Sequence, residues 1–263
     1  MTEVPKTLSD EAVVAINALI DGNDRFRNWN DPEIRTIFRH IEKLQKVDAR
    51  DAFVRFAALA AVCGNVESLL EYARKALLLP GELLSKPEIR TSLANAGLYG
   101  KAQQIGTWLL DRKRGFFPQI WQDAVSCGQV LAIQERLFDA KRTYPELSDV
   151  DFSLVERAAS VMQERGLSDA DIIAVFDLMG EIQRSHRIMF AGKLASTLKV
   201  LRPPEDPPYL YFAMPIDSDV SEIHAMNREL ARLVVEKLPE GAFPQGLVAS
   251  FAKTLSVELR AAA

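Results

Sequence analysis

The residues best suited to chemistry in this chain are few and widely spaced. Cys63 and Cys127 each stand just before a glycine, and no further cysteine or histidine follows at the spacing of a metal site. Both cysteines are therefore predicted to be structural, because small apolar side chains suit tight interhelical turns. Asp169 and Asp171 fall in the first turn of a predicted helix, where the helix dipole favours negative charge. We predict no metal site.

The common catalytic motifs are missing as well. The chain lacks the G-x-x-x-x-G-K-[ST] and G-x-G-x-x-G loops, and it lacks H-E-x-x-H, G-x-S-x-G and C-x-x-C. We therefore predict no cofactor and no catalytic residue, and we favour a protein that is not an enzyme.

One basic pair leaves an alternative open. Arg35 precedes His40 by five positions, and this R-x4-H pairing resembles a motif of some helical ribonucleases. The resemblance implies a nuclease role for both residues, whereas a solvated basic helix face is the simpler interpretation. His186 and His224 lie in polar helical surroundings and are predicted to be surface residues.

The charge is segregated along the chain. The total of 32 basic and 36 acidic residues gives a net charge of −4, which supplies no bulk attraction to nucleic acid or anionic lipid. Residues 146–181 carry nine acids and two bases, and residues 182–204 carry five bases and no acid. The basic stretch either contacts nucleic acid or an acidic partner, or neutralises the acidic helices that precede it. We favour neutralisation.

Aromatic side chains near predicted loops are candidates for partner contact, because such residues often anchor interfaces. The segment RGFFPQIW at residues 114–121 lies between two predicted hairpins. The predicted partner-binding residues, taken from the aromatic and basic groups together, are Trp108, Phe116, Phe117, Trp121, Arg184, Arg187, Lys193, Tyr209 and Tyr211.

The dominant pattern from residue 10 to residue 201 is helical. In residues 52–62, apolar side chains recur at the spacing of one helix face, Gly64 breaks the run, and Asn65 is suited to cap a helix over residues 66–79. Similar glycines follow at Gly97, Gly128 and Gly166, with spacings of 33, 31 and 38 residues, and an earlier one is plausible at Gly22. Periods of this size predict stacked helical hairpins.

This part of the chain resembles the tetratricopeptide-repeat family. The resemblance rests on small residues before a turn glycine and on a closing proline, namely Ala57, Ala60, Ala61, Gly64, Ala76 and Pro80, and in a second copy on Gly97, Tyr99 and Ala102. It implies antiparallel helix pairs stacked into a superhelix whose concave groove holds a peptide or a partner helix. The turns CGNV and CGQV are also similar to pentatricopeptide repeats, which implies RNA binding, but the acidic balance argues against that.

The pattern changes at residues 202–208, which contain four prolines and cannot continue a helix. After them we predict a buried strand over residues 209–216 and a helix that opens at Ser218 or Ser221. A second strand over residues 247–251 follows, although that segment could instead begin a final helix. We thus predict a helical-repeat domain over residues 1–202 and a small β-α-β unit over residues 209–263.

The fold class predicted is mainly α, an α-solenoid of stacked hairpins with a small C-terminal α/β cap. The leading hypothesis is a non-enzymatic scaffold, adaptor or chaperone-like module that binds another protein or peptide. The alternatives are an RNA-binding protein or helical ribonuclease, and a self-assembling subunit whose C-terminal strands pair with a second chain. The start of the chain has no basic and apolar leader and no apolar run reaches about 20 residues, so we expect a cytoplasmic protein without membrane contact.

Overall fold

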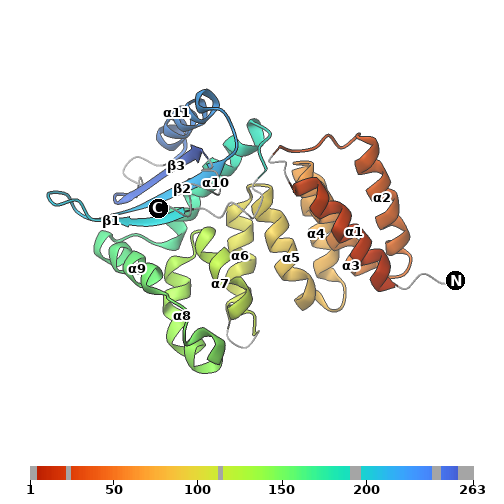
Figure 1. Cartoon of the computed structure of the whole chain (residues 1–263), viewed down its shortest axis with the longest axis horizontal. Coiled ribbons are helices and arrows are strands. Elements are labelled where there is room, and N and C mark those ends of the chain that lie inside the picture. Colours follow the sequence, from red (N-terminus) through yellow and green to blue (C-terminus); the bar gives the residue numbers. More distant parts are fainter. Residues whose placement is uncertain (1–4, 22–24, 112–114, 190–196, 239–243, 254–263) are drawn as a thin grey trace. The chain divides into compact units, whose positions relative to one another are not determined.

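The computed structural model describes residues 5–21, 25–111, 115–189, 197–238 and 244–253. The described chain is mainly helical and ends in a small three-stranded sheet, which confirms the coarse fold class (Figure 1). The helices of the first half are α1 (Pro5–Ile20), α2 (Pro32–Gln45), α3 (Ala49–Val62), α4 (Val66–Leu78), α5 (Glu82–Asn95) and α6 (Tyr99–Leu109). The elements that follow are α7 (Phe117–Ser126), α8 (Val130–Thr143), η2 (Pro145–Leu147), α9 (Ser153–Arg165), α10 (Asp169–Ser185), β1 (Thr197–Leu201), β2 (Tyr209–Ile216), α11 (Val220–Lys237) and β3 (Leu247–Lys253).

The chain forms two compact units. Unit 1 comprises residues 1–105 and 183–191, and unit 2 comprises residues 106–182 and 192–263. The division falls within α6 and α10, and the domain boundary predicted at residues 202–208 stays a prediction.

The helical hairpins share one turn geometry. Gly64, Gly97, Gly128 and Gly166 all have φ values between 65° and 84°, in the left-handed region, as the glycine pattern predicted. In each turn the residue after the glycine donates its backbone N–H to the carbonyl five positions earlier. These bonds run from Asn65 to Ala60 at 2.9 Å, Leu98 to Leu93 at 2.9 Å, Gln129 to Ala124 at 2.9 Å and Leu167 to Met162 at 2.8 Å. Gly22 lies outside the described residues.

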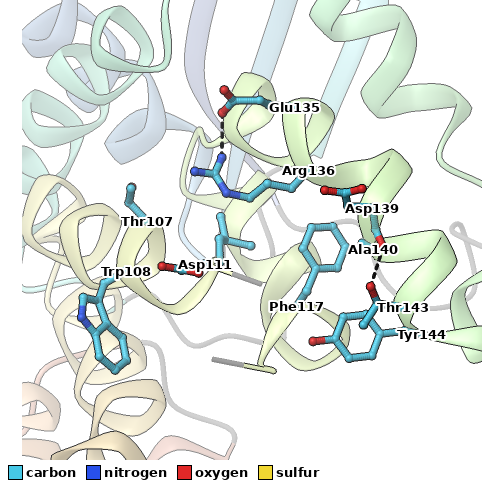
Figure 2. A pocket seen from close by; sticks show the side chains of 11 residues that line it. Thr107, Trp108, Asp111, Phe117, Glu135, Arg136, Asp139, Ala140, Thr143 and Tyr144 are labelled. Atoms are coloured by element: carbon cyan, nitrogen blue, oxygen red, sulfur yellow. Dashed lines mark hydrogen bonds and ion pairs between the residues drawn. The ribbon is translucent and has the colours of Figure 1, made fainter. Parts of the chain in front are cut away.

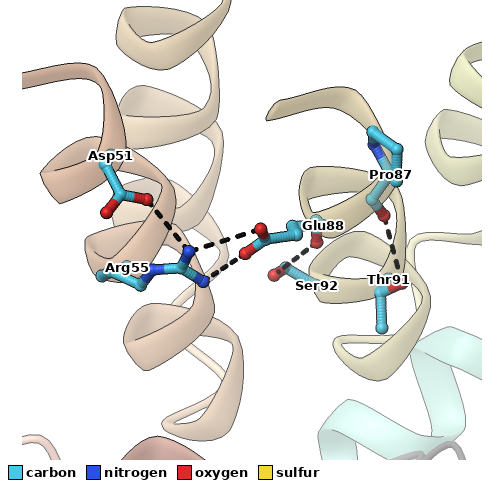
Figure 3. Close-up of polar contacts among 6 residues, drawn as sticks. All are labelled: Asp51, Arg55, Pro87, Glu88, Thr91 and Ser92. Carbon is cyan, nitrogen blue, oxygen red and sulfur yellow. Dashed lines mark hydrogen bonds and ion pairs between the residues drawn. The ribbon is translucent and has the colours of Figure 1, made fainter. Parts of the chain in front are cut away.

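Unit 1 is built around α3, which packs against α1, α2, α4 and α5. The predicted cap is confirmed at Asn65, whose side chain accepts the Ser68 N–H at 3.1 Å. Between α3 and α5 the guanidinium of Arg55 binds the carboxylates of Asp51 and Glu88 (Figure 3). The Arg55 side chain is 12% exposed, so this link is shielded from water more than an ordinary surface ion pair.

The end of α10 joins unit 1 through a residue in an unusual conformation. Arg187 has a φ of 56°, and the Ile188 N–H donates to the Gln183 carbonyl at 2.7 Å, so this turn repeats the glycine turns with an arginine in the left-handed position. The Phe26 N–H donates to the Arg187 carbonyl at 2.8 Å, and the Arg187 guanidinium donates to the Phe26 carbonyl at 3.1 Å. These bonds connect two segments about 160 residues apart.

Unit 2 contains the sheet, whose strand order is β1-β2-β3. The β2 and β3 strands are parallel and are joined by α11, which confirms the predicted β-α-β unit. The sequence analysis predicted a helical pattern up to residue 201, but residues 197–201 form the strand β1. It pairs antiparallel with β2, from Thr197 opposite Ala213 to Leu201 opposite Tyr209, so residues 202–208 connect two paired strands.

The sheet has one well-covered face. Side chains alternate along β2, so that Leu210, Phe212, Met214 and Ile216 are buried. Phe176 of α10 packs edge-on against Phe212, with ring centroids 5.1 Å apart. At β3 the Asn227 side chain accepts the Phe251 N–H at 2.8 Å and donates to the Phe251 carbonyl at 3.0 Å. An α11 side chain thus takes the hydrogen bonds that a further strand would make at this position.

We predict that alanine at two of the turn glycines has unequal effects on stability. A Cβ at Gly128 would lie 2.7 Å from Cγ2 of Ile172, whereas a Cβ at Gly166 would meet nothing within 4 Å. Both substitutions carry the strain of a left-handed alanine, about 1 kcal/mol, and Gly128→Ala adds about 1–3 kcal/mol for the overlap. Urea denaturation of the two variants measures the difference, and equal losses would contradict it.

We also predict that Arg187→Gly is more stable than Arg187→Ala. Both variants lose the guanidinium bonds to the 26–27 backbone, but only glycine relieves the left-handed strain, by about 1 kcal/mol. The comparison of their urea midpoints tests this. An alanine variant at least as stable as the glycine variant would show that the backbone at residue 187 is unstrained.

Candidate functional site

Two of the predicted partner-binding residues, Trp108 and Phe117, line a cavity in unit 2. The cavity has a volume of about 380 Å³ and is bounded by the end of α6, the start of α7 and one face of α8 (Figure 2). Its aromatic lining consists of Trp108, Phe117 and Tyr144, and its carboxylates are those of Asp111, Glu135 and Asp139.

A second cavity continues the first along α8. It has a volume of about 570 Å³ and shares Thr107, Glu135 and Arg136 with the first cavity, so the two adjoin along α8 and are together called the α8 groove. The α8 residues that line the groove are Leu131, Ala132, Gln134, Glu135, Arg136, Asp139, Ala140 and Thr143. Apart from Gln134, they fall at the spacing of one helix face. They span about three helical turns, or roughly 18 Å.

Arg136 is held in place at the junction of the two cavities. Its Nη1 donates to the Ala132 carbonyl at 2.8 Å and to Oε2 of Glu135 at 2.9 Å. In the second cavity, Oε1 of Gln134 is buried and has no hydrogen-bond partner among the residues that the structure describes. The groove therefore combines a fixed cation with a buried acceptor that a bound group could satisfy.

The N-terminus of α8 is anchored by an acid from another helix. The carboxylate of Asp169, at the start of α10, accepts the backbone N–H groups of Leu131 and Ala132, each at 2.9 Å. Burial raises the pKa of Asp169, while these backbone N–H groups act in the opposite direction. Asp169 was predicted as a helix-start acid of its own helix. Its role as a cap on α8 has no local sequence signal, because the two segments are 37 or more residues apart.

The remaining predicted aromatic residues of unit 2 lie elsewhere. Phe116 is half-buried just before α7, and Trp121 packs against the buried Phe152 with ring centroids 4.6 Å apart. Tyr209 and Tyr211 are half-buried on β2, and the Tyr211 hydroxyl lies 2.9 Å from Oγ of Ser250. The cavity thus brings together Trp108 and Phe117, and not these four.

The predicted basic residues of unit 1 make hydrogen bonds to backbone carbonyls. Arg184 donates to the carbonyls of Ala96 and Gly97 at 3.2 and 2.6 Å, at the C-terminal end of α5, where the helix dipole favours a cation. Arg187 binds the backbone at residues 26–27, and Lys193 lies outside the described residues. Contact of these side chains with a partner stays a prediction.

Arg35 and His40 bind different groups in unit 1. Arg35 donates to Oδ1 of Asn30 at 3.0 Å. Nε2 of His40 lies 3.0 Å from the Leu8 carbonyl and 3.4 Å from the Glu11 carboxylate. The two side chains therefore have separate structural partners, and a shared nuclease role stays untested.

Neither cysteine forms a disulfide; each precedes a turn glycine, and Cys127 is buried whereas Cys63 is half-buried. Burial, the largest effect, raises the pKa of Cys63 to about 12, and the nearby Asp31 carboxylate adds to the rise.

No group of three or more histidine, cysteine or acidic side chains in the described ranges could hold a metal ion. None of the helices described is long and apolar enough to cross a membrane.

We predict that Cys63 reacts slowly with iodoacetamide at neutral pH. The raised pKa lowers its thiolate fraction about a thousandfold relative to an ordinary thiol. In a Cys127→Ala variant the alkylation rate of Cys63 rises about tenfold per pH unit and does not level off up to pH 10. The same variant in denaturant is the control and levels off near pH 9. A plateau near pH 9 in the folded variant would contradict the raised pKa.

Comparison with known proteins identified no relative of this chain. No protein-family model, curated protein or solved structure matches this chain.

Proposed function

We propose that this chain is a non-enzymatic protein-binding module and that the α8 groove of unit 2 receives a segment of the partner. The observation that carries this proposal is the cavity of about 380 Å³ where Trp108, Phe117 and Tyr144 lie beside three carboxylates. Tryptophan and tyrosine are enriched at the centres of protein interfaces, because they bury a large apolar area and keep a polar tip. The volume falls within the range typical of binding pockets.

The rigidity of the groove supports the same proposal. Asp169 fixes the start of α8, Gly128 fixes the turn before it, and Arg136 is bonded at the junction of the two cavities. A preformed surface loses less conformational entropy on binding than a flexible one.

The proposal extends to the arrangement of unit 1 as stacked, tetratricopeptide-like hairpins. In support, α3 contacts both α1 and α5, and the second helices α2 and α4 pack beside them. A cavity of about 200 Å³ lies where α1, α3 and α5 meet and includes Ile16, Ala58 and Asn95 in its lining. As the compartment we propose the reducing cytoplasm, which suits two cysteines that form no disulfide.

We expect Trp108→Ala to weaken partner binding about thirtyfold or more and Phe138→Ala to leave it intact. Trp108 is half-buried in the lining of the cavity, whereas Phe138 is 72% exposed on the same α8 and lies outside the lining. Loss of a buried aromatic anchor weakens binding by about 2 kcal/mol or more, some thirtyfold.

The measurement is quantitative affinity purification from the source cell with wild-type and variant baits, with circular dichroism to verify the fold of each. Proteins captured by wild type and by Phe138→Ala, but lost with Trp108→Ala, are the expected result. Identical captured sets from both variants, or none from wild type, would refute the α8 groove as the binding site.

A further inference from the structure

A separate cavity in unit 1 has a different chemistry. It has a volume of about 190 Å³ and is lined by Trp29, Ile34, Arg35, Phe38, Ser68 and Tyr72, from α2, α4 and the turn before α2. Three of these six side chains are aromatic, and among the described residues Arg35 is the sole charged side chain in the lining.

The aromatic wall is held by ring contacts that reach the core. Trp29 meets Phe38 edge-on with centroids 5.9 Å apart, and Phe38 lies 4.8 Å from Phe56. Phe56 is 2% exposed and stacks on Tyr72 at 4.9 Å. The rings that face the cavity are therefore fixed before any ligand arrives.

The polar groups of this cavity have unused hydrogen-bonding capacity. Within the described part of the chain, the Trp29 indole N–H, the Ser68 hydroxyl and the Tyr72 hydroxyl make no hydrogen bond. Arg35 is exposed and uses Nη2 on Asn30. Burial raises the pKa of Tyr72, so its hydroxyl remains a donor at neutral pH. The cavity thus offers aromatic faces, N–H and O–H donors and a cation.

These groups match an acidic, proline-containing segment. Proline rings pack on aromatic side chains, and a proline-rich backbone loses little conformational entropy on binding because the pyrrolidine rings already restrict φ. A carboxylate beside the prolines would pair with the guanidinium of Arg35.

The chain itself carries such a segment between β1 and β2. Residues 202–208 have the sequence RPPEDPP, and Pro204, Glu205, Asp206 and Pro207 are all exposed. Figure 1 shows this connection projecting away from the sheet of unit 2. In the exposed tip two prolines therefore flank two adjacent carboxylates, the chemistry that the unit 1 cavity matches.

We propose that the aromatic cavity of unit 1 binds the exposed tip, residues 204–207, of a second copy of this chain. Prolines of the tip pack on Trp29 and Tyr72, and Glu205 or Asp206 pairs with Arg35. Cavity and tip are different surfaces, so the contact is heterologous and each copy can bind two others. This self-association goes beyond the proposed function and uses neither the α8 groove nor its residues.

The first test is titration of a synthetic peptide of residues 201–209 into the full chain, followed by isothermal calorimetry. Arg35→Gln weakens peptide binding about tenfold, and Tyr72→Phe, which removes the hydroxyl alone, weakens it about threefold. Arg39→Gln is the matched control, because Arg39 is exposed on the same helix and outside the cavity lining. A peptide with Gln and Asn in place of Glu205 and Asp206 also binds about tenfold more weakly.

The second test is sedimentation velocity of the full chain over a hundredfold range of concentration. Wild type and Arg39→Gln grow in average mass with concentration, whereas Arg35→Gln and the double variant Glu205→Gln/Asp206→Asn remain monomeric. A mixture of these last two forms a one-to-one complex that grows no further, because one copy supplies an intact tip and the other an intact cavity.

Three results would overturn the proposal. One is equal peptide binding by wild type and Arg35→Gln, and another is self-association that persists in the two charge variants. The third is cavity-dependent peptide binding by a chain that stays monomeric throughout, which would assign the cavity to a proline-rich segment of a different protein.

Discussion

The hairpin turns depend on one backbone constraint, a residue held in the left-handed conformation directly after a helix. At Gly64, Gly97, Gly128 and Gly166 this conformation lets the next residue reach back to the carbonyl five positions earlier. The turn closes the carbonyl end of one helix and starts the next helix within two or three residues, and such short connections favour antiparallel neighbours. The cavities described above are lined by helices that these turns connect, so their geometry depends on the turns.

The α8 groove illustrates this dependence. Gly128 ends α7 and places Val130 at the start of α8, while Gly166 ends α9 and places Asp169 at the start of α10. Asp169 then accepts two N–H groups of α8, whose own cap residue Gln129 makes no side-chain cap bond. A cap supplied by one hairpin to another fixes their spacing, and the groove beside α8 follows from that spacing.

Much of the local structure could be predicted from the sequence, because its determinants are local. The turn glycines, the cap at Asn65 and the strand at residues 209–216 follow from residue type and from patterns within about ten positions. The reciprocal bonds between Ser168 and Asp171 at the start of α10 belong to the same class. In each case a short-range hydrogen bond or a turn determines the conformation.

The β1 strand and the cavities could not be predicted, because their determinants are distant in sequence. Residues 197–201 become a strand through pairing with β2 across the proline segment, and in isolation their pattern is too short to separate strand from helix. Of nine predicted partner residues, Trp108 and Phe117 line the α8 groove. The carboxylates of the groove could not be found from the sequence, because Asp111 and Asp139 line one cavity only once the chain has folded.

Arg187 shows why composition alone misjudges such residues. In the sequence it belongs to a basic stretch for which an anionic partner and neutralisation of the acidic helices are the two interpretations, yet its backbone takes the position that glycine takes in the other turns. The strain of that position is tolerated because the Arg187 backbone and guanidinium both bond the segment at residues 26–27. Phe26 in turn packs over Gly64, where a Cβ would lie 2.8 Å from its ring. The conformations of Arg187, Phe26 and Gly64 thus depend on one another. The guanidinium of Arg187 helps to hold two distant segments of unit 1 together.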